Sequence, residues 1–351
     1  MIYPVNRVSY LDWLRVIACF AVILFHISGS CGFALELSSE NHIIMELLHS
    51  LVIWCVPVFI MISGALFLDP GKNICIKKLY THNILRIFVA FVFWSFVYAS
   101  YNFIGSEDSN RINGWILQLL GGHFHLWFLW LIIGLYILTP ILRKISKEKK
   151  LMQYLILVSI FFNFAIPFLL DITDIFIPAL QPIVRIIQSH LTNLNLQTIG
   201  GYITYFFLGY YLRTINLSKK KENLLIFLGA LISITTVGIT YMSFQSVSSS
   251  KGELFQFCSL YALAQSVSVF LICKRFFHDK ESKTISYLSK YSFGIYLIHM
   301  LIIYLLVLHR ITPTILNPII GIPLMSLLTF LISIGATVLI SHIPIIKKWC
   351  I

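Results

Sequence analysis

The segment DWLRVIACFAVILFHISGSCGF, residues 12–33, decides the class to which this protein belongs. It is apolar for long enough to cross a membrane, because the hydrocarbon core of a bilayer requires about 20 residues of helix. It carries Asp12 and Arg15 at its start, and no small-residue cleavage site follows a short apolar core, so it lacks the form of a cleaved signal peptide. We therefore expect a transmembrane helix that remains in the protein.

The rest of the chain repeats this pattern. Of its 351 residues, 58% are hydrophobic and only 11% are charged, whereas an average soluble domain has roughly 25% charged residues. These values exclude a soluble globule, and they also exclude a disordered chain, which needs low hydrophobicity and high charge. We predict an all-α integral membrane protein that forms one transmembrane domain over residues 1–351. The ten predicted transmembrane helices cover approximately residues 12–33, 45–68, 80–104, 124–142, 151–170, 197–213, 223–243, 254–273, 290–309 and 318–343.

The orientation in the membrane follows from the lysines and arginines between the spans. One set of alternate segments carries nineteen of the 26, and the other set carries four. The nineteen are Arg7, Lys72, Lys77, Lys78, Arg143, Lys144, Lys147, Lys149, Lys150, Arg213, Lys219, Lys220, Lys221, Lys274, Arg275, Lys280, Lys283, Lys347 and Lys348. This asymmetry places both termini in the cytoplasm. It also explains the net charge of +12 without a nucleic-acid partner.

Two further features concern the loops and the cysteines. The longest outer loop is predicted at residues 171–196, and its prolines, Pro178 and Pro182, favour irregular structure. The seven cysteines do not form a disulfide framework, and we expect most of them to be buried packing thiols. No cysteine–histidine spacing indicates a zinc site, so we expect no metal.

The charged residues of the first span need an explanation. An ionisable side chain inside a membrane helix costs roughly 2.5–3.5 kcal/mol on insertion scales. Arg15 and His26 are eleven positions apart, which on a helix places them on one face, ~16 Å apart along the axis. Asp12 lies within pairing distance of Arg15. In one interpretation Arg15 binds an anionic group and His26 acts as a base or nucleophile deeper in the same channel. In the other, Arg15 extends to the membrane interface and His26 hydrogen-bonds inside the bundle.

The same helix resembles the opening helix of the acyltransferase-3 family of bacterial membrane acyltransferases. The resemblance rests on the run Leu-Asp-Trp-Leu-Arg at residues 11–15, followed by ten residues and then His26. Later stretches resemble the family in the same order along nearly the whole chain. They are VPVFIMISG at residues 56–64, HLWFL at 125–129 with its continuation to Thr139 and Pro140, YFFLGYY at 205–211 and YSFGIYLIH at 291–299.

The resemblance implies O-acylation, usually O-acetylation, of a cell-surface glycan or its lipid-linked precursor. It implies acetyl-CoA or another acyl-CoA as a cytoplasmic donor substrate, no permanently bound cofactor, and a place in the bacterial cytoplasmic (inner) membrane. The family's essential histidine corresponds to His26 and its arginine to Arg15. The chain looks like the compact members, which have no attached esterase-like domain. Self-association into a homo-oligomer stays open.

Cationic side chains are expected at the donor site, because CoA carries several phosphates. Lys77, Lys78 and Arg86 lie at the cytoplasmic start of the third span and would act together with Arg15. Lys77 and Lys78 are equally explained as ordinary charges of a cytoplasmic loop. The family's Arg-x-x-Arg motif is only half kept, since Arg86 fits its second arginine and Asn83 stands in place of the first.

Supporting residues are expected on the ninth span and in the first outer loop. His299 lies three positions after Tyr296 on one helix face, and it either packs in the bundle or supports the site. Glu36, in the first outer loop, either orients His26 or the sugar or is a solvated charge.

The start of the fourth span is a candidate for the mouth of the acceptor site. His125 and Trp127 would border this mouth, and an aromatic belt at the membrane interface is the alternative for Trp127. His123 lies two residues before His125. Because alternate residues of a helix face different sides, we expect these two histidines to be a poor metal pair.

Two mechanisms and two function classes stay open. His26 would either deprotonate the acceptor hydroxyl or carry the acyl group transiently. The alternative function is a transporter or flippase of a glycan or small solute, which would use the same buried arginine and histidine without bond chemistry. The chain shows no inverted repeat and no pair of helices broken by glycine or proline at matching positions, which speaks against transport.

Overall fold

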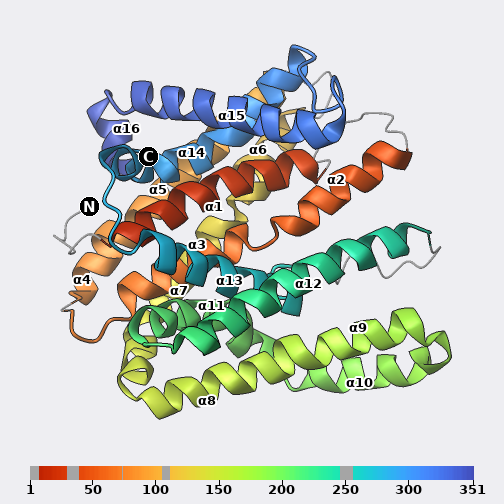
Figure 1. Ribbon diagram of the computed structural model, residues 1–351. Helices are drawn as coiled ribbons and strands as arrows, with labels where there is room; N and C mark the ends of the chain where they lie inside the picture. The colour runs from red at the N-terminus through yellow and green to blue at the C-terminus, as the bar shows by residue number, and fades with distance from the viewer. Residues whose placement is uncertain (1–7, 30–38, 73, 105–110, 246–255) are drawn as a thin grey trace.

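A computed structural model describes residues 8–29, 39–72, 74–104, 111–245 and 256–351, and all secondary structure within these ranges is helical (Figure 1). The longer helices run beside one another as a bundle. The elements are α1 (Ser9–Ser28), α2 (Ser39–Leu51), α3 (Cys55–Phe67), α4 (Ile76–Lys78), η1 (Leu79–Ile84), α5 (Leu85–Ile104), α6 (Arg111–Gly121), η2 (Phe124–Leu126), α7 (Trp127–Lys147), α8 (Lys149–Ile160), η3 (Phe161–Ala165), α9 (Ile166–Phe176), η4 (Pro178–Leu180), α10 (Gln181–Asn193), α11 (Leu196–Thr214), α12 (Lys219–Gln245), α13 (Leu260–Phe277), α14 (Lys283–Leu308), α15 (Pro318–Ile340) and α16 (Pro344–Trp349).

Within the described residues, nine helical stretches are long and apolar enough to cross a membrane. A lipid environment demands such helices, because each of them satisfies its own backbone hydrogen bonds. The nine stretches are Ser9–Ser28, Glu40–Phe67, Ile76–Ile104, Ile112–Lys147, Lys149–Phe176, Lys219–Ile239, Leu260–Phe277, Lys283–Leu308 and Pro318–Ile340. The predicted class, an all-α integral membrane protein, is confirmed.

The sixth of the ten predicted spans, residues 197–213, forms α11, which is not among the nine. Its central residues, Tyr205 to Leu208, are buried against neighbouring helices. A helix that contacts protein can carry more tyrosine and glycine than one that contacts lipid. Its lower hydropathy therefore follows from its place inside the bundle.

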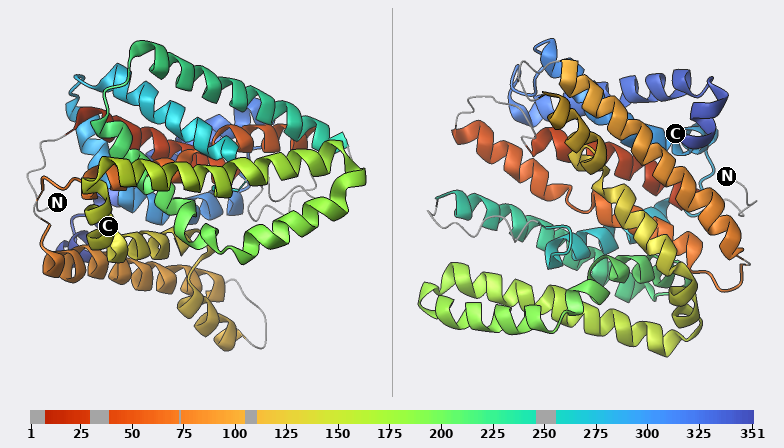
Figure 2. Two further views of the ribbon diagram at one scale, coloured as in Figure 1. Left: turned by 90° about the horizontal axis from the view of Figure 1, so that it is seen from below. Right: turned by 180° about the vertical axis from the view of Figure 1, so that it is seen from behind.

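Three local features differ from the prediction. The span predicted at 45–68 is divided into α2 and α3, and α6 precedes the span predicted at 124–142. The prediction of irregular structure at 171–196 is wrong, because α9 continues to Phe176 and α10 folds back along it (Figure 2). Pro178 and Pro182 stand in the first turns of η4 and α10, where the missing N–H is not needed for a helical bond.

Of the segments that carry the nineteen basic residues, those in the described part of the chain lie at one end of the bundle. Figure 1 shows α4, α16 and the start of α1 at this end. Arg143 of α7 donates to the carbonyl of Lys72, and the amine of Lys274 donates to the carbonyl of Leu212 over 2.6 Å. We call this part of the molecule the basic end.

A close crossing of α3 and α11 holds the centre of the bundle together. A Cβ atom at Gly64 would overlap the backbone of Phe206, and a Cβ atom at Gly209 would overlap the backbone carbonyl of Met61. Small residues let membrane helices approach to backbone contact in this way. Both glycines belong to the stretches that resemble the acyltransferase-3 family, so their presence there has a packing reason.

Candidate active site

Four histidines gather in the interior of the bundle, and we call them the histidine cluster: His26, His123, His125 and His299. The ring centre of His26 lies 5.2 Å from that of His299 and 6.4 Å from that of His125. The rings of His125 and His299 are 5.2 Å apart. Nδ1 of His123 lies 2.7 Å from Nδ1 of His125, a hydrogen bond in which either ring can donate. Residues far apart in the chain thus form one group of titratable rings.

Three different elements position this cluster. His26 stands in the last turn of α1, and His299 is on α14, which packs directly against α1. His125 belongs to the short 3-10 turn η2, and the hydroxyl of Tyr296 donates to its carbonyl oxygen. Because His123 and His125 precede the α-helix, the rule that alternate residues face different sides does not apply. The two rings therefore meet, so the geometric reason for expecting a poor metal pair does not hold.

Three ring nitrogens of the cluster are buried and have no hydrogen-bond partner among the described residues. They are Nδ1 of His26, Nε2 of His125 and Nε2 of His299. Leaving a buried donor or acceptor unpaired costs about 1–3 kcal/mol. A buried polar atom without a partner therefore calls for an explanation, and a bound substrate or a transferred proton would provide the missing partner. His125 and His299 are 1% and 0% exposed, so this group of nitrogens lies well inside the protein.

The other nitrogens of the cluster are held in place. Nδ1 of His299 lies 2.6 Å from the carbonyl oxygen of Tyr296, and this nitrogen must donate because a carbonyl only accepts. Nε2 of His123 lies 3.0 Å from the hydroxyl of Tyr304. His299 consequently presents Nε2 as an acceptor when the ring is neutral. Packing in the bundle and support of the site were the two predicted roles of His299. The structure places its ring against that of His26, which is compatible with both roles.

A row of aromatic rings leads away from His26. The ring of Phe25 contacts that of Phe257 at 5.2 Å between centres, and Phe257 stacks on Trp127 at 5.7 Å. Trp127 in turn lies 5.8 Å from Tyr202. The side chain of Trp127 is thus part of a continuous aromatic surface next to the cluster, although it also remains partly exposed.

Tyr202 also lines a cavity with a volume of about 730 Å³. The cavity lies between α7, α9, α10, α11 and the start of α13. Its walls combine aromatic rings with polar groups, including Phe168, Asp171 and Gln188. Asn163 and Tyr261 line it as well. Oδ1 of Asn163 and the hydroxyl of Tyr261 are buried and have no hydrogen-bond partner in the described part of the chain. Such walls suit a polar ligand with apolar faces.

At the other end of α1, Arg15 faces Asp12 as predicted. Nη1 of Arg15 lies 3.6 Å from Oδ1 of Asp12, and Asp12 also accepts a hydrogen bond of 2.7 Å from Ser289 of α14. A second serine, Ser286, donates to the other carboxylate oxygen over 3.4 Å. Asp12 is 5% exposed, and it thereby joins α1 to α14 while it faces the guanidinium group.

Arg15 and Arg86 both lie near Tyr136 of α7. Both guanidinium groups lie within Coulombic range of the buried Tyr136 hydroxyl. Pro140 lies four residues further along α7 and removes the backbone N–H that would otherwise bond to the Tyr136 carbonyl. Two of the four predicted donor-binding cations therefore lie near one site.

Arg86 is held by the C-terminal residues of the chain. It follows the π-helical turn η1, donates to the carbonyl of Ile351 and lies 5.5 Å from the ring centre of Phe293. Its Nε is buried without a hydrogen-bond partner among the described residues. This nitrogen is a donor that a ligand could still use.

The remaining predicted residues lie elsewhere. Lys77 is exposed on α4 and Lys78 is half-buried beside it, and neither lines the cavity next to Tyr202. Glu36 lies outside the described residues, so its predicted role is not tested. Within those residues, no group of three or more His, Cys, Asp or Glu is arranged to hold a metal ion.

The sequence did not identify two residues that position the histidine cluster, His123 and Tyr304. His123 was assessed only as a metal ligand, and no feature of the sequence singled out Tyr304. Their signal in the sequence was weak, because His123 and Tyr304 are separated by 181 positions. Asn163 and Tyr261 were likewise indistinguishable from ordinary polar residues of apolar helices.

Comparison with known proteins agrees with this architecture. A family model described as an acyltransferase domain, that of the acyltransferase-3 family, matches residues 8–341. Proteins from Staphylococcus aureus strains MSSA476, MW2 and N315 are each 24% identical over 300 residues, which cover 84% of this chain and 81% of theirs. Each of them is named a probable poly-beta-1,6-N-acetyl-D-glucosamine export protein. No solved structure matches the chain significantly. With a match that spans nearly the whole helical bundle, this chain belongs to the acyltransferase-3 family of membrane acyltransferases.

Proposed function

We propose that this protein is an O-acyltransferase, most simply an O-acetyltransferase, of the bacterial cytoplasmic membrane. It takes the acyl group from cytoplasmic acyl-CoA and transfers it to a hydroxyl of a cell-surface glycan or of its lipid-linked precursor. The basic end faces the cytoplasm in this proposal, because loops rich in lysine and arginine stay on that side.

The observation that carries the proposal is a set of three buried histidine nitrogens, on His26, His125 and His299, that have no hydrogen-bond partner in the described part of the protein. A neutral imidazole is suited to accept a proton from a hydroxyl near neutral pH. A structural histidine would normally have both nitrogens paired. The cluster is therefore well suited to proton transfer in a site from which bulk water is excluded.

The reaction has two routes. In the direct route, His26 removes the proton from the acceptor hydroxyl, the oxygen attacks the thioester carbonyl, and the C–S bond breaks to release CoA as thiolate, which takes up a proton. In the covalent route, a nitrogen of His26 attacks the thioester first, and the C–S bond breaks to release CoA as thiolate. The acceptor hydroxyl then gives its proton to the thiolate or to a neighbouring histidine, and its oxygen displaces the neutral imidazole from the acyl group. His125 and His299 contact His26 in both routes and orient its ring or share its proton.

The donor would approach along α1 and α7. Arg15 and Arg86, near Tyr136, are cations for its anionic part, and Arg15 is ~16 Å from His26 along the axis of α1. A flexible arm of that length is required to bring a thioester from the arginines to the histidines. Lys77 and Lys78 would contribute by attracting an anion to the basic end.

The acceptor would occupy the cavity of about 730 Å³, which the aromatic row of Phe25, Phe257, Trp127 and Tyr202 connects to His26. Sugars present apolar ring faces together with hydroxyls. Aromatic walls complement the ring faces, and polar lining residues such as Asn163 and Tyr261 complement the hydroxyls.

The test uses purified protein, acetyl-CoA labelled in the acetyl group, and a glycan acceptor. We expect His26→Ala to lose label transfer by about 10²–10⁴-fold, the usual contribution of a general base. His309→Ala is the matched control, because His309 is an exposed histidine at the end of α14. Equal transfer by His26→Ala and His309→Ala would sink the proposal. Intact-protein mass after donor addition without acceptor separates the routes, since only the covalent route gives an acyl adduct.

Export is the second candidate, and the observation in its favour is the name of the Staphylococcus aureus relatives. The same buried arginines and histidines would then form a substrate or proton path. Protein reconstituted in vesicles distinguishes the two. Glycan movement without release of CoA supports export, and CoA release that depends on the acceptor supports the acyltransferase.

A further inference from the structure

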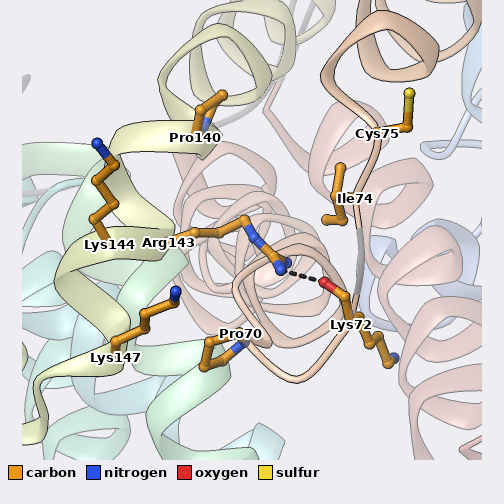
Figure 3. A pocket seen from close by; sticks show the side chains of 8 residues that line it. All are labelled: Pro70, Lys72, Ile74, Cys75, Pro140, Arg143, Lys144 and Lys147. Carbon is orange, nitrogen blue, oxygen red and sulfur yellow. Dashed lines mark hydrogen bonds between the residues drawn. The ribbon is translucent and has the colours of Figure 1, made fainter.

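A cavity also lies at the basic end, between the loop after α3 and the last two turns of α7. It has a volume of about 390 Å³ and is lined by Pro70, Lys72, Pro140, Arg143, Lys144 and Lys147, among others. Figure 3 shows Arg143 reaching across this pocket to the carbonyl of Lys72, with Lys144 and Lys147 on the α7 side. We call it the basic pocket.

The charged side chains that line the basic pocket are all positive. Its lining includes four cationic side chains and no acidic one. Arg213 of α11 lies next to it, and one carboxylate, Asp69, lies 4.0 Å from the Arg213 guanidinium. One negative charge thus faces five positive charges, so the pocket carries a strongly positive potential.

The packing of Arg143 and Lys72 preserves this potential. Arg143 donates over 2.8 Å to the carbonyl of Phe67 and also to that of Lys72, and it is held in place without losing its charge. Nζ of Lys72 is buried and has no hydrogen-bond partner among the described residues. Burial lowers the pKa of Lys72, and the charges of Arg213 and Arg143 lower it further, against the opposing effect of Asp69. A bound anion would relieve all of these unfavourable interactions.

Helix α7 connects the basic pocket to the histidine cluster. Arg143 precedes the end of this helix, Tyr136 lies between Arg15 and Arg86 on the same helix, and His125 lies just before its start. The 18 positions from Arg143 to His125 correspond to ~27 Å of helix. A ligand that reaches from one site to the other needs an anionic head, a long neutral arm and a reactive tip.

We propose that the basic pocket binds the outermost phosphate of the nucleotide end of the acyl-CoA donor, beyond the phosphates that Arg15 and Arg86 hold nearer the arm, with Lys144 and Lys147 as phosphate-binding residues. This assignment rests on the proposed function, and it adds residues that loop-charge reasoning treats only as determinants of topology. The spacing of Arg143, Lys144 and Lys147 places Arg143 and Lys147 one helical turn apart on one face, with Lys144 three positions from Lys147. Lysine serves as a point charge for phosphate in such sites.

The test compares two double variants of the full-length protein in detergent. Lys144→Gln with Lys147→Gln removes two charges from the pocket, and Lys149→Gln with Lys150→Gln removes two exposed charges of α8 that do not line it. We measure binding of CoA by calorimetry. Loss of a hydrogen bond to a charged group weakens binding about tenfold, so we expect the first variant to bind CoA at least tenfold more weakly and the second to bind it like the wild type.

Competition and kinetics identify the part of the ligand that is bound. Adenosine 3′,5′-bisphosphate should displace CoA, whereas phosphate-free pantetheine should not. In turnover, the Lys144 and Lys147 variant should raise the KM for acetyl-CoA and leave kcat nearly unchanged, because the phosphates do not change during the reaction. Inorganic phosphate and vesicles of phosphatidylglycerol are further competitors. Displacement by the vesicles alone would assign the pocket to a lipid headgroup and overturn the nucleotide site.

The outcomes separate this inference from the proposed function. If wild-type protein binds CoA and transfers the acyl group while the Lys144 and Lys147 variant binds CoA with unchanged affinity, only the basic pocket assignment is overturned. If the wild-type protein does not bind CoA, both the basic pocket assignment and the proposed function are overturned. Equal weakening in the two double variants would show a general charge effect and would also overturn the assignment.

Discussion

Replacement of Gly209 by alanine tests the crossing of α3 and α11 directly. The added methyl group would overlap the backbone carbonyl of Met61, which cannot rotate away as a side chain would. Overpacking of a core costs about 1–3 kcal/mol, and the rigid neighbour places this case near the upper value. Alanine is about 1 kcal/mol better than glycine in a helix, so we expect a net loss of about 2 kcal/mol in the free energy of unfolding.

Gly134→Ala on α7 is the matched control, because a Cβ atom there meets nothing within 4 Å. It should stabilise the protein by up to about 1 kcal/mol, so the two variants should differ by about 3 kcal/mol. Unfolding in mixed micelles, followed by circular dichroism, measures both. If Gly209→Ala proves as stable as Gly134→Ala, the close crossing does not exist.

The double variant Gly64→Ala with Gly209→Ala sharpens this test. Both methyl groups separate the same two helix backbones, since Gly64 faces Phe206 and Gly209 faces Met61. Once one methyl group has moved the helices apart, the second finds space. We expect the double variant to lose less free energy of unfolding than the sum of the losses in the two single variants, because the effects of substitutions at neighbouring sites are generally not additive. Strict additivity would refute a shared crossing.

Three more predictions concern the site. His299→Ala should lower acyl transfer while leaving the affinity for CoA unchanged, since His299 contacts His26 and lies far from the basic pocket; isothermal binding and label transfer measured on one preparation check this, and a parallel loss of CoA affinity would contradict it. Asp12→Asn should destabilise the protein by about 1–3 kcal/mol because the hydrogen-bonded carboxylate next to Arg15 loses its charge; chemical unfolding measures it, and a stability equal to the wild type would contradict the role of this carboxylate. CoA affinity should fall as pH rises through the lowered pKa of Lys72, because the Lys72 amine, which lies near Asp69, Arg143 and Arg213, then loses its positive charge. Lys72→Arg stays charged and should flatten the pH profile of CoA affinity, whereas identical profiles for the variant and the wild type would show that Lys72 does not contribute.

Much of the fold was predictable because membrane insertion depends on local composition. A run of about 20 apolar residues forms a spanning helix wherever it stands in the chain. For the same reason the alternation of lysines and arginines correctly grouped the segments that meet at the basic end. Pro178 and Pro182 misled the prediction, since a proline that breaks a helix interior is tolerated in a first turn.

The candidate site was only partly predictable. Asp12, Arg15 and His26 share one helix, and their relative placement follows from helix geometry alone. His125 and His299 were assigned to separate surroundings, because nothing in a sequence states which helices are neighbours. The contact between His123 and His125 required the 3-10 turn of η2, which a helical periodicity does not reveal.

The sequence by itself determined the membrane class, the family and the Arg15–His26 face, because hydropathy, charge and helical spacing are local properties. Only the tertiary structure decided that α1, η2 and α14 converge on one histidine cluster and that α7 joins it to a basic pocket. The physical reason is that these contacts depend on how close two helices come. At the crossing of α3 and α11, that distance is set by the absence of two methyl groups, at Gly64 and Gly209.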